Sequence, residues 1–195
     1  MAIEEHRRIT DLDTLKALAH PLRLKLYRAL FHAGAATASQ LADQVDEAVS
    51  LVSYHLRKLA AHGVISEAEP RSADGRERWW EVDRSGYSVR DQDFRDAPER
   101  AAAFASFTRV AFHEHNELYE RFLDEQSTWE QEWRTAAFNS QYLPRLTAEE
   151  LRRLQGELGE LLKRWDAYST AAAQAGDTEG RENIVLHLYG FPTRP

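Results

Sequence analysis

The sequence contains no cysteine among its 195 residues. The chain therefore forms no disulfide, has no thiolate nucleophile and cannot ligate a metal through sulfur. It also lacks any apolar run close to the roughly 18 residues of a membrane-spanning helix. The first residues have no apolar stretch of the kind found in signal peptides. We expect a cytoplasmic protein with no membrane partner.

Common catalytic motifs are missing as well. The sequence has no glycine-rich phosphate loop, no His-Glu-x-x-His and no Gly-x-Ser-x-Gly. Carboxylates are frequent toward the C-terminus, but they alternate with arginines at the spacing of a solvated helix face, as in Arg152, Arg153 and Glu157. We expect no enzyme activity and no cofactor.

The excess of negative charge is confined to the second half of the chain. The net charge is −7, yet residues 1–90 are neutral, with thirteen Lys and Arg against thirteen Asp and Glu. Residues 91–195 carry twelve basic and nineteen acidic residues. Because nucleic acid repels an acidic surface, we expect the neutral front half to be the part that faces a polyanion.

The stretch from Val49 to His62, ended by Gly63, predicts an amphipathic helix. Its core-facing side carries Val49, Val52, Leu56 and Leu59. Its opposite side carries Glu47, Ser50, Leu51, Tyr54, Arg57, Lys58 and Ala61, with Ser53 and His55 on the flanks. Hydroxyls, an aromatic ring and cations on one face suit the bases and phosphates of DNA. The alternative is an ordinary solvated surface helix.

The residues before this helix predict three shorter helices. After an N-terminal arm at residues 1–10, Thr10, Asp11 and Asp13 suit a helix start, and His20-Pro21 separates that helix from a second that ends near Gly34. Residues 37–40, Thr-Ala-Ser-Gln, have the spacing of a capping box and begin a third helix. Two consecutive helices joined by a short turn are the helix-turn-helix arrangement.

A β-hairpin is predicted directly after the long helix. A β-like stretch starts at Val64, residues 71–78 form a polar loop with an Asp-Gly turn, and residues 79–82, Trp-Trp-Glu-Val, form a second strand. Such a hairpin is a wing, and its tip offers Arg71, Arg76 and Arg78 to a phosphate backbone. A solvated basic tip is the alternative interpretation.

These motifs together resemble the winged helix-turn-helix domain of the ArsR family of bacterial transcription regulators. The resemblance is carried by Leu15-Lys-Ala-Leu-Ala-His-Pro-Leu-Arg-Leu-Lys-Leu26, Ser39-Gln-Leu-Ala42, Val52-Ser-Tyr-His-Leu-Arg-Lys-Leu59 and His62-Gly-Val-Ile65. It implies a homodimer on double-stranded DNA that binds a palindromic operator and usually represses transcription. The expected DNA-binding residues are Ser39, Gln40, Ser50, Leu51, Ser53, Tyr54, His55, Arg57, Lys58, Arg76 and Arg78.

The sequence departs from the metal sensors of that family. Those sensors commonly carry cysteine in the helix before the recognition helix, and here that helix has none. Another metal arrangement in the family uses His and carboxylates after the wing. His113 and Glu117 share a helical face, but His115 points about 200° away from His113. We therefore expect no metal site.

The second half predicts a helical region with a terminal strand, over residues 91–195. A long helix runs from Pro98 to about Glu125, with an apolar face too broad for solvent. Further helices are expected over residues 128–142 and after the capping box that starts at Thr147, and residues 183–190 are strand-like. We expect these apolar faces to pack internally or to form a dimer interface.

Aromatic residues in this region allow one further interpretation. Most of the apolar stripe is expected to be core or interface. The alternative is a pocket for a small apolar effector, lined by Trp129, Trp133, Trp165 and Tyr168. No residue set specifies which ligand such a pocket takes.

The sequence thus predicts a mainly α fold with a small β-wing. A winged helix-turn-helix domain at residues 11–90 precedes a helical C-terminal extension for dimerisation or effector binding. The leading hypothesis is a sequence-specific transcriptional regulator. The alternative is a winged-helix module that docks a protein and does not read DNA, which the acidic pI of about 5.6 favours.

Overall fold

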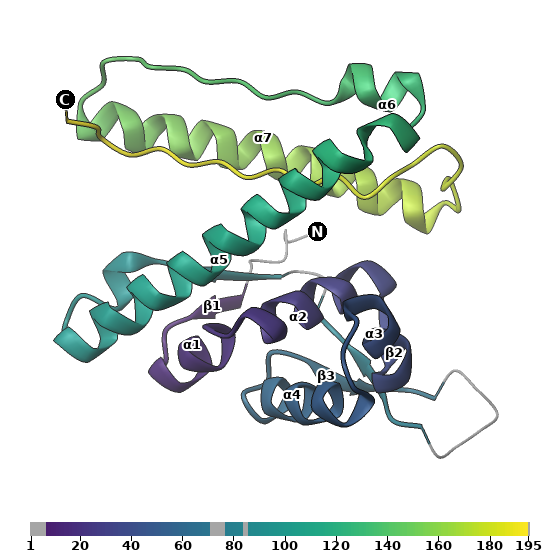
Figure 1. Ribbon diagram of the computed structural model, residues 1–195. Helices are drawn as coiled ribbons and strands as arrows, with labels where there is room; N and C mark the ends of the chain where they lie inside the picture. The colour runs from purple at the N-terminus through teal and green to yellow at the C-terminus, as the bar shows by residue number, and fades with distance from the viewer. Residues whose placement is uncertain (1–6, 71–76, 84–85, 195) are drawn as a thin grey trace. The chain divides into compact units, whose positions relative to one another are not determined.

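The computed structural model describes residues 7–70, 77–83 and 86–194 (Figure 1). The chain divides into two compact units, Met1–Gln126 and Ser127–Pro195. Helices dominate both units, and the strands are short and lie in the first unit. The predicted fold class, mainly α with a small β-wing and a helical C-terminal extension, is confirmed.

The first two helices begin and end where the sequence predicted. Helix α1 (Leu12–Leu18) is capped by Asp11, whose carboxylate accepts a hydrogen bond from the backbone N–H of Thr14 at 2.7 Å. Helix α2 (Pro21–Ala33) starts with proline, which needs no hydrogen-bond acceptor there, and ends at Gly34 with φ of 76°.

The next two helices form the helix-turn-helix. Helix α3 (Ala38–Val45) has the predicted capping box: the Gln40 N–H donates to Thr37 Oγ1 at 3.3 Å, and the Thr37 N–H donates to Gln40 Oε1 at 2.9 Å. Asp46, with φ of 53°, turns the chain sharply. Helix α4 (Val49–Ala61) then packs against α3 and is the helix predicted over residues 49–62.

A three-stranded antiparallel sheet includes the wing. Strand β4 (Trp79–Glu81) lies between β3 (Ser66–Ala68) and β2 (Ala35–Thr37). The β3–β4 hairpin was predicted. Strand β2 was not, because three small residues before a helix carry no strand pattern of their own.

The prediction of an N-terminal arm at residues 1–10 is partly wrong. Residues Arg7–Ile9 form strand β1, which pairs in parallel with β5 (Tyr87–Val89), and Ile9 is only 2% exposed. The pairing partner lies some eighty positions away, so no local pattern announces it. Arg7 also donates from Nη2 to the carbonyl of His62 at 3.1 Å and from Nη1 to the carbonyl of Gly63, and thus binds the chain just after α4.

The core of the first unit lies between the helices and the sheet. It contains the buried side chains of Leu15, Leu18, Leu26, Leu30, Leu41, Val52, Leu56, Leu59, Ile65, Trp80 and Phe94. Val49 was predicted to face this core but is 47% exposed. It is the first residue of α4 and comes before Val52, the first residue of this helix that is buried in the core. The other three residues of the predicted stripe are fully buried.

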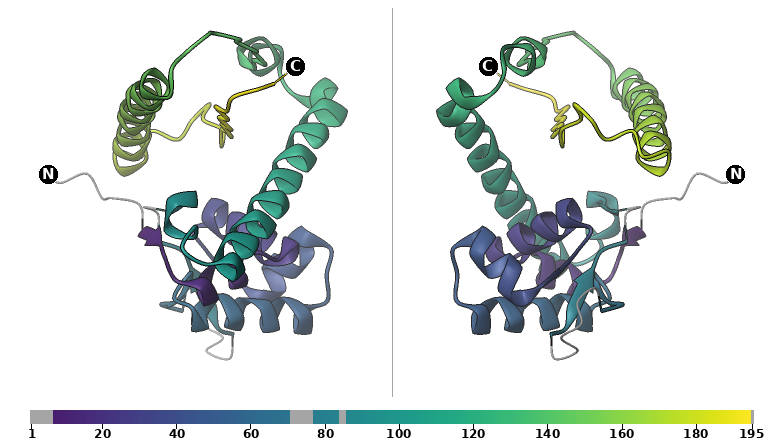
Figure 2. Two further views of the ribbon diagram at one scale, coloured as in Figure 1. Left: turned by 90° about the vertical axis from the view of Figure 1, so that its left-hand side faces the viewer. Right: turned by 90° about the vertical axis from the view of Figure 1, so that its right-hand side faces the viewer.

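Helix α5 (Pro98–Glu125) belongs to the first unit and follows the short turn η1 (Asp91–Asp93). It packs against α1 and α2, which lie between α5 and α4 in Figures 1 and 2. Phe107 is buried, and the ring of Phe104 stacks on Phe94 with centroids 6.1 Å apart. The predicted functional boundary near residue 90 stays a prediction.

A buried ion pair joins α5 to α2. Glu114 on α5 is 2% exposed, and its Oε2 lies 3.5 Å from Nη1 of Arg28. Burial raises the pKa of Glu114, although Arg28 opposes this effect. Burial also lowers the pKa of Arg28. Each charge therefore depends on the other to offset its loss of hydration.

The second unit contains η2 (Gln126–Thr128), which begins at the unit boundary, and the helices α6 (Gln131–Ala136) and α7 (Ala148–Gln174). The Thr147 capping box is confirmed. Two predictions are wrong here. The helix expected over residues 128–142 is reduced to α6, since Ala137 is extended and Pro144 excludes a continuing helix. Residues 183–190 form no strand, because no other strand of the described chain pairs with them.

Large apolar side chains of the second unit stay exposed. Ala172 is the one buried apolar residue among the described residues of this unit, whereas Phe138, Trp165 and Phe191 are 73%, 63% and 70% exposed. These surfaces remain available for contacts beyond the single chain. Among the described residues, no helix is both long and apolar enough to cross a membrane.

The substitution Arg28→Met tests the buried ion pair. We expect it to lower the free energy of unfolding by about 2 kcal/mol, less than the roughly 3–5 kcal/mol of a fully buried pair, because Arg28 is partly exposed. The uncompensated Glu114 then has a pKa raised further. The loss should be largest at neutral pH and shrink as the pH falls toward the ordinary glutamate pKa, since neutral Glu114 needs no cation.

Urea unfolding at two pH values measures this effect. Lys16→Met is the matched control, because the exposed pair of Lys16 with Glu99, 2.7 Å apart, also joins a helix to α5. We expect the control to cost less than about 1 kcal/mol. An equal cost for both variants, or the same cost of Arg28→Met at both pH values, contradicts the assignment.

Candidate nucleic-acid interface

The outward face of α4 is exposed as the sequence predicted. Ser50, Leu51, Tyr54, Arg57 and Lys58 lie on the surface, with Leu51 39% and Tyr54 47% exposed, and Ser53 is partly exposed. These side chains lie on the side of α4 opposite the buried Val52, Leu56 and Leu59. The face therefore offers hydroxyl, aromatic and apolar groups at its start and cations toward its end.

The two cations of α4 are held by their neighbours on the helix. Arg57 donates from Nε to the carbonyl of Ser53 at 3.2 Å, and Lys58 Nζ lies 5.7 Å from the centroid of the Tyr54 ring. Both positive charges lie in the last turns of the helix, where the helix dipole favours them.

His55 does not lie on the exposed face, which corrects the prediction. It is 5% exposed, because it is three residues after Val52 and four before Leu59 and shares the buried side of α4. Its ring lies 4.6 Å from the ring of His20, and its Nδ1 is 3.5 Å from Nη1 of Arg23. A base-reading role for His55 is therefore wrong.

Arg23 connects the end of α1 to α4. It donates to the backbone carbonyl of Lys16 at 3.2 Å and to that of Ala17, while it contacts His55. Helix α1 ends before a further turn can supply N–H donors to these two carbonyls, so the guanidinium of Arg23 supplies them instead. Sequence reasoning missed this role, because the contact joins positions 32 residues apart.

His20 and His55, whose rings pack together on the inner side of α4, favour their neutral forms. Burial lowers the pKa of His20, and the charge of Arg23 lowers it further. Burial likewise lowers the pKa of His55, together with His20 and Arg23. His20 Nδ1 is buried and has no hydrogen-bond partner among the described residues. A proton on either ring therefore places a second positive charge beside a guanidinium that cannot lose its own.

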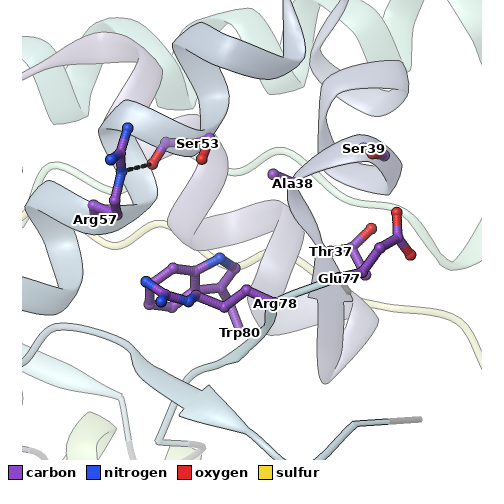
Figure 3. Close-up of a pocket in the computed structure, with 8 residues that line it drawn as sticks. All are labelled: Thr37, Ala38, Ser39, Ser53, Arg57, Glu77, Arg78 and Trp80. Carbon is purple, nitrogen blue, oxygen red and sulfur yellow. Dashed lines mark hydrogen bonds between the residues drawn. The ribbon is translucent and has the colours of Figure 1, made fainter. Parts of the chain in front are cut away.

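A cavity of about 390 Å³ opens between α3, α4 and the wing (Figure 3). It is lined by Thr37, Ala38, Ser39, Ser53, Arg57, Glu77, Arg78 and Trp80. Three of these residues are the cap and the first two positions of α3, whose N–H groups lack helical acceptors. Ser39, which was predicted to bind DNA, lines this cavity together with Arg57 and Arg78.

The charges around this cavity favour an anion. Arg57 and Arg78 contribute positive charge, as does the N-terminal end of α3. Glu77 opposes them. Arg78 Nε also lies 3.3 Å from Glu67 Oε1. Its guanidinium carbon lies 5.5 Å from the centroid of the Trp80 ring, since side chains two residues apart in an extended chain lie on the same face. The period-two spacing of Arg78 and Trp80 is a signal that the sequence contained.

Three other residues that the sequence predicted near DNA do not add to this surface in the same way. Gln40 is exposed, but its side-chain oxygen accepts the Thr37 N–H in the capping box. Its first role is therefore to cap α3. Arg76 and Arg71 lie outside the described residues.

A second cavity of about 300 Å³ lies at the C-terminal end of α4. It is lined by Asp13, Lys16, Ala17, Arg23, Lys58 and His62. Lysines and an arginine outnumber the one carboxylate in this lining. No local sequence pattern predicts this cavity, because its residues come from three separate helices and the turn after α4.

The comparisons with known proteins agree with this geometry. Residues 18–68 match the family model described as a helix-turn-helix domain. The match runs from the last residue of α1 to the last residue of β3 and thus includes α3, its turn and α4. A search of curated proteins gave no match. The chain contains a helix-turn-helix domain, a structure that binds double-stranded DNA through its second helix.

The sites considered in the second half of the sequence have different outcomes. His113 and Glu117 are paired at 3.3 Å on α5, and the described residues contain no group of three or more His, Cys, Asp or Glu that could hold a metal ion. Trp165 and Tyr168 are in edge-to-face contact with centroids 5.8 Å apart. The two cavities described above are lined by other residues. The effector pocket with Trp129 and Trp133 stays a prediction.

The pH dependence of stability tests the cluster beneath α4. Because the pKa values of His20 and His55 are lowered, the unfolded chain binds protons that the folded chain does not. We expect the free energy of unfolding to fall as the pH drops from about 7.5 through the ordinary histidine pKa of about 6.5 and below it. His55→Gln should make this decrease smaller.

Urea unfolding measured across this pH range checks the prediction. His32→Gln, which replaces an exposed histidine of α2, is the matched control and should keep the pH dependence of the original chain. If both variants keep it unchanged, the cluster does not titrate as described.

Proposed function

We propose that this protein is a sequence-specific DNA-binding transcriptional regulator and that it is not an enzyme. The observation that supports this most directly is the exposed face of α4. In a helix-turn-helix domain the second helix lies in the major groove, and here that helix presents Ser50, Tyr54 and Leu51 from its first turns.

The chemistry of each group suggests its contact. The hydroxyls of Ser50, Ser53 and Tyr54 hydrogen-bond to base edges, and Leu51 contacts a thymine methyl group. Arg57 and Lys58, farther along the helix, bind phosphates on the flank of the groove.

The cavity between α3, α4 and β4 suits one phosphate of the DNA backbone. A phosphate there lies near the N-terminal end of α3 and between two guanidinium groups, those of Arg57 and Arg78. Such a contact carries no sequence information, but it fixes the position of α4 in the groove.

The finer part of the proposal rests on the resemblance to ArsR regulators. The order and spacing of the motifs between Leu15 and Ile65 support membership of that family. The resemblance then implies a homodimer on a palindromic operator and repression as the usual outcome. The half-sites lie about one helical turn of DNA apart.

A protein-docking module is the second candidate, and the acidic pI of about 5.6 favours it. The structure contains an observation against it. Arg57 and Arg78 line one cavity and Lys58 follows Arg57 on α4, although the front half of the chain has a net charge of zero. A surface that docks protein has no general need for this cluster.

Two substitutions on α4 separate base contacts from phosphate contacts. Arg57→Ala should weaken binding to all DNA sequences and reduce the slope of log affinity against log salt by about 1. Tyr54→Ala should change the preferred sequence, with a cost of about 1–3 kcal/mol at the base pair it contacts.

The measurement is fluorescence anisotropy with fragments selected from genomic DNA, at several salt concentrations. Arg109→Ala on α5 is the matched control and should leave both affinity and salt slope unchanged, since this exposed arginine lies on another helix. Failure of every genomic fragment to bind at low salt would rule out the proposal.

A further inference from the structure

One side of α7 carries an uninterrupted seam of apolar residues. The seam consists of Leu151, Leu154, Leu158, Leu161, Trp165 and Tyr168, and it ends at Ala172. Successive members are alternately three and four residues apart. This is the spacing of a coiled coil, with Leu151, Leu158, Trp165 and Ala172 at the a positions and Leu154, Leu161 and Tyr168 at the d positions. In a coiled coil each such residue packs between residues of a second helix.

Four of the seven seam residues are exposed, although the guanidinium of Arg181 lies 5.3 Å from the centroid of the Tyr168 ring and donates to its hydroxyl at 3.4 Å. Leu154, Leu161, Trp165 and Tyr168 are 38%, 40%, 63% and 57% exposed. Leu151 and Leu158 are partly buried, and a Cβ placed on Gly190 would lie 3.3 Å from Leu151, so the C-terminal segment runs beside the other edge of the seam. The exposed edge is therefore the one that a second helix has room to cover.

The exposed area is substantial for a single helix. Trp165 and Tyr168 have on the order of 150–250 Å² of surface each and expose more than half of it. In two copies these rings alone offer about 400 Å², against the roughly 1,200 Å² of total area at the lower limit of a specific interface. The leucines and the flanking residues of both helices supply the remainder.

The charges beside the seam indicate how the second helix runs. The g positions that precede Leu151, Leu158 and Trp165 are Glu150, Glu157 and Arg164. The positions that follow each d residue, the e positions, are Gln155, Leu162 and Ser169, which carry no charge. In a parallel pair g faces e, and no complementary charges meet.

An antiparallel pair of identical helices brings g against g. Glu157 then faces Arg164 of the second copy, and the twofold axis repeats the same contact in reverse. Leu158 packs beside Leu161 of the second copy in the central layer. Glu157 is 3.6 Å from Arg153 in its own helix, but both side chains remain largely exposed and open to a further partner.

We propose that α7 forms an antiparallel coiled coil with α7 of a second copy of this chain. The partner is a second copy because the charge pattern is complementary to itself under twofold symmetry. This inference rests on the homodimer of the proposed function and assigns it an interface. The orientation of the dimer is fixed by the pairing of Glu157 with Arg164.

Charge reversal in the full-length chain tests the inference without DNA. Glu157→Arg and Arg164→Glu each place like charges together twice, and each should raise the dimer dissociation constant by about tenfold, measured by sedimentation equilibrium. A mixture of the two variants should form a heterodimer as tight as the original dimer, since every contact across the seam is then complementary.

Matched controls keep the test specific. Glu160→Arg and Arg152→Glu make the same charge changes on the same helix away from the seam. Like Glu157→Arg, the Glu160→Arg substitution also removes an ion pair within the helix, that with Lys163 at 2.9 Å. Both controls should dimerise like the original chain. Circular dichroism checks that each variant retains its helices.

Three outcomes would overturn the inference: a monomeric original chain at all concentrations, single variants that dimerise normally, or weakened single variants that do not recover on mixing. The second and third outcomes leave a homodimer intact but place its interface or orientation elsewhere. Because these measurements contain no DNA, the anisotropy experiment judges the regulator function separately.

Discussion

The position of α4 depends on the packing of its inner side. Val52, Leu56 and Leu59 are fully buried, and they fix the rotation of the helix about its axis, since a turn of one residue would bury Arg57 or Lys58 instead. Each of these side chains contributes on the order of 1.5–3 kcal/mol by burial. The outward face of the helix is thus determined by the residues on its inner face.

Polar contacts at the ends of α4 add direction to this apolar packing. His55, His20 and Arg23 join the inner side of the helix to the end of α1, while Arg7 binds the chain that follows it. A hydrogen bond has a narrow range of angles, which apolar contact lacks. The helix is held against rotation by its leucines and against sliding by these donors and acceptors.

The sequence predicted those features that depend on neighbours along the chain. Asp11, Pro21, Gly34 and Thr37 interact with backbone groups within four residues, so the ends of the first three helices could be read directly. The exposed face of α4 followed from the helical period, which also placed Arg57 and Lys58 correctly. Two residues of α4 were placed wrongly: His55, predicted on the flank of the exposed face, is buried, and Val49, predicted to face the core, is exposed.

The remaining features depend on partners far away in the chain. Strand β1 exists because Tyr87–Val89 lies beside it, and residues 183–190 form no strand although their composition suits one. In both cases the presence of a neighbouring strand decided the outcome, since strands are stabilised in pairs. The cavities near α4 were also missed, as each combines residues from separate elements.

The parallel pairing of β1 with β5 has a consequence for how the protein is made. During synthesis Arg7 leaves the ribosome early, but its strand cannot pair until the residues after the wing have emerged. All four helices of the first ninety residues are then already available. The N-terminal strand therefore pairs late, since its contact joins residues about eighty positions apart in the sequence.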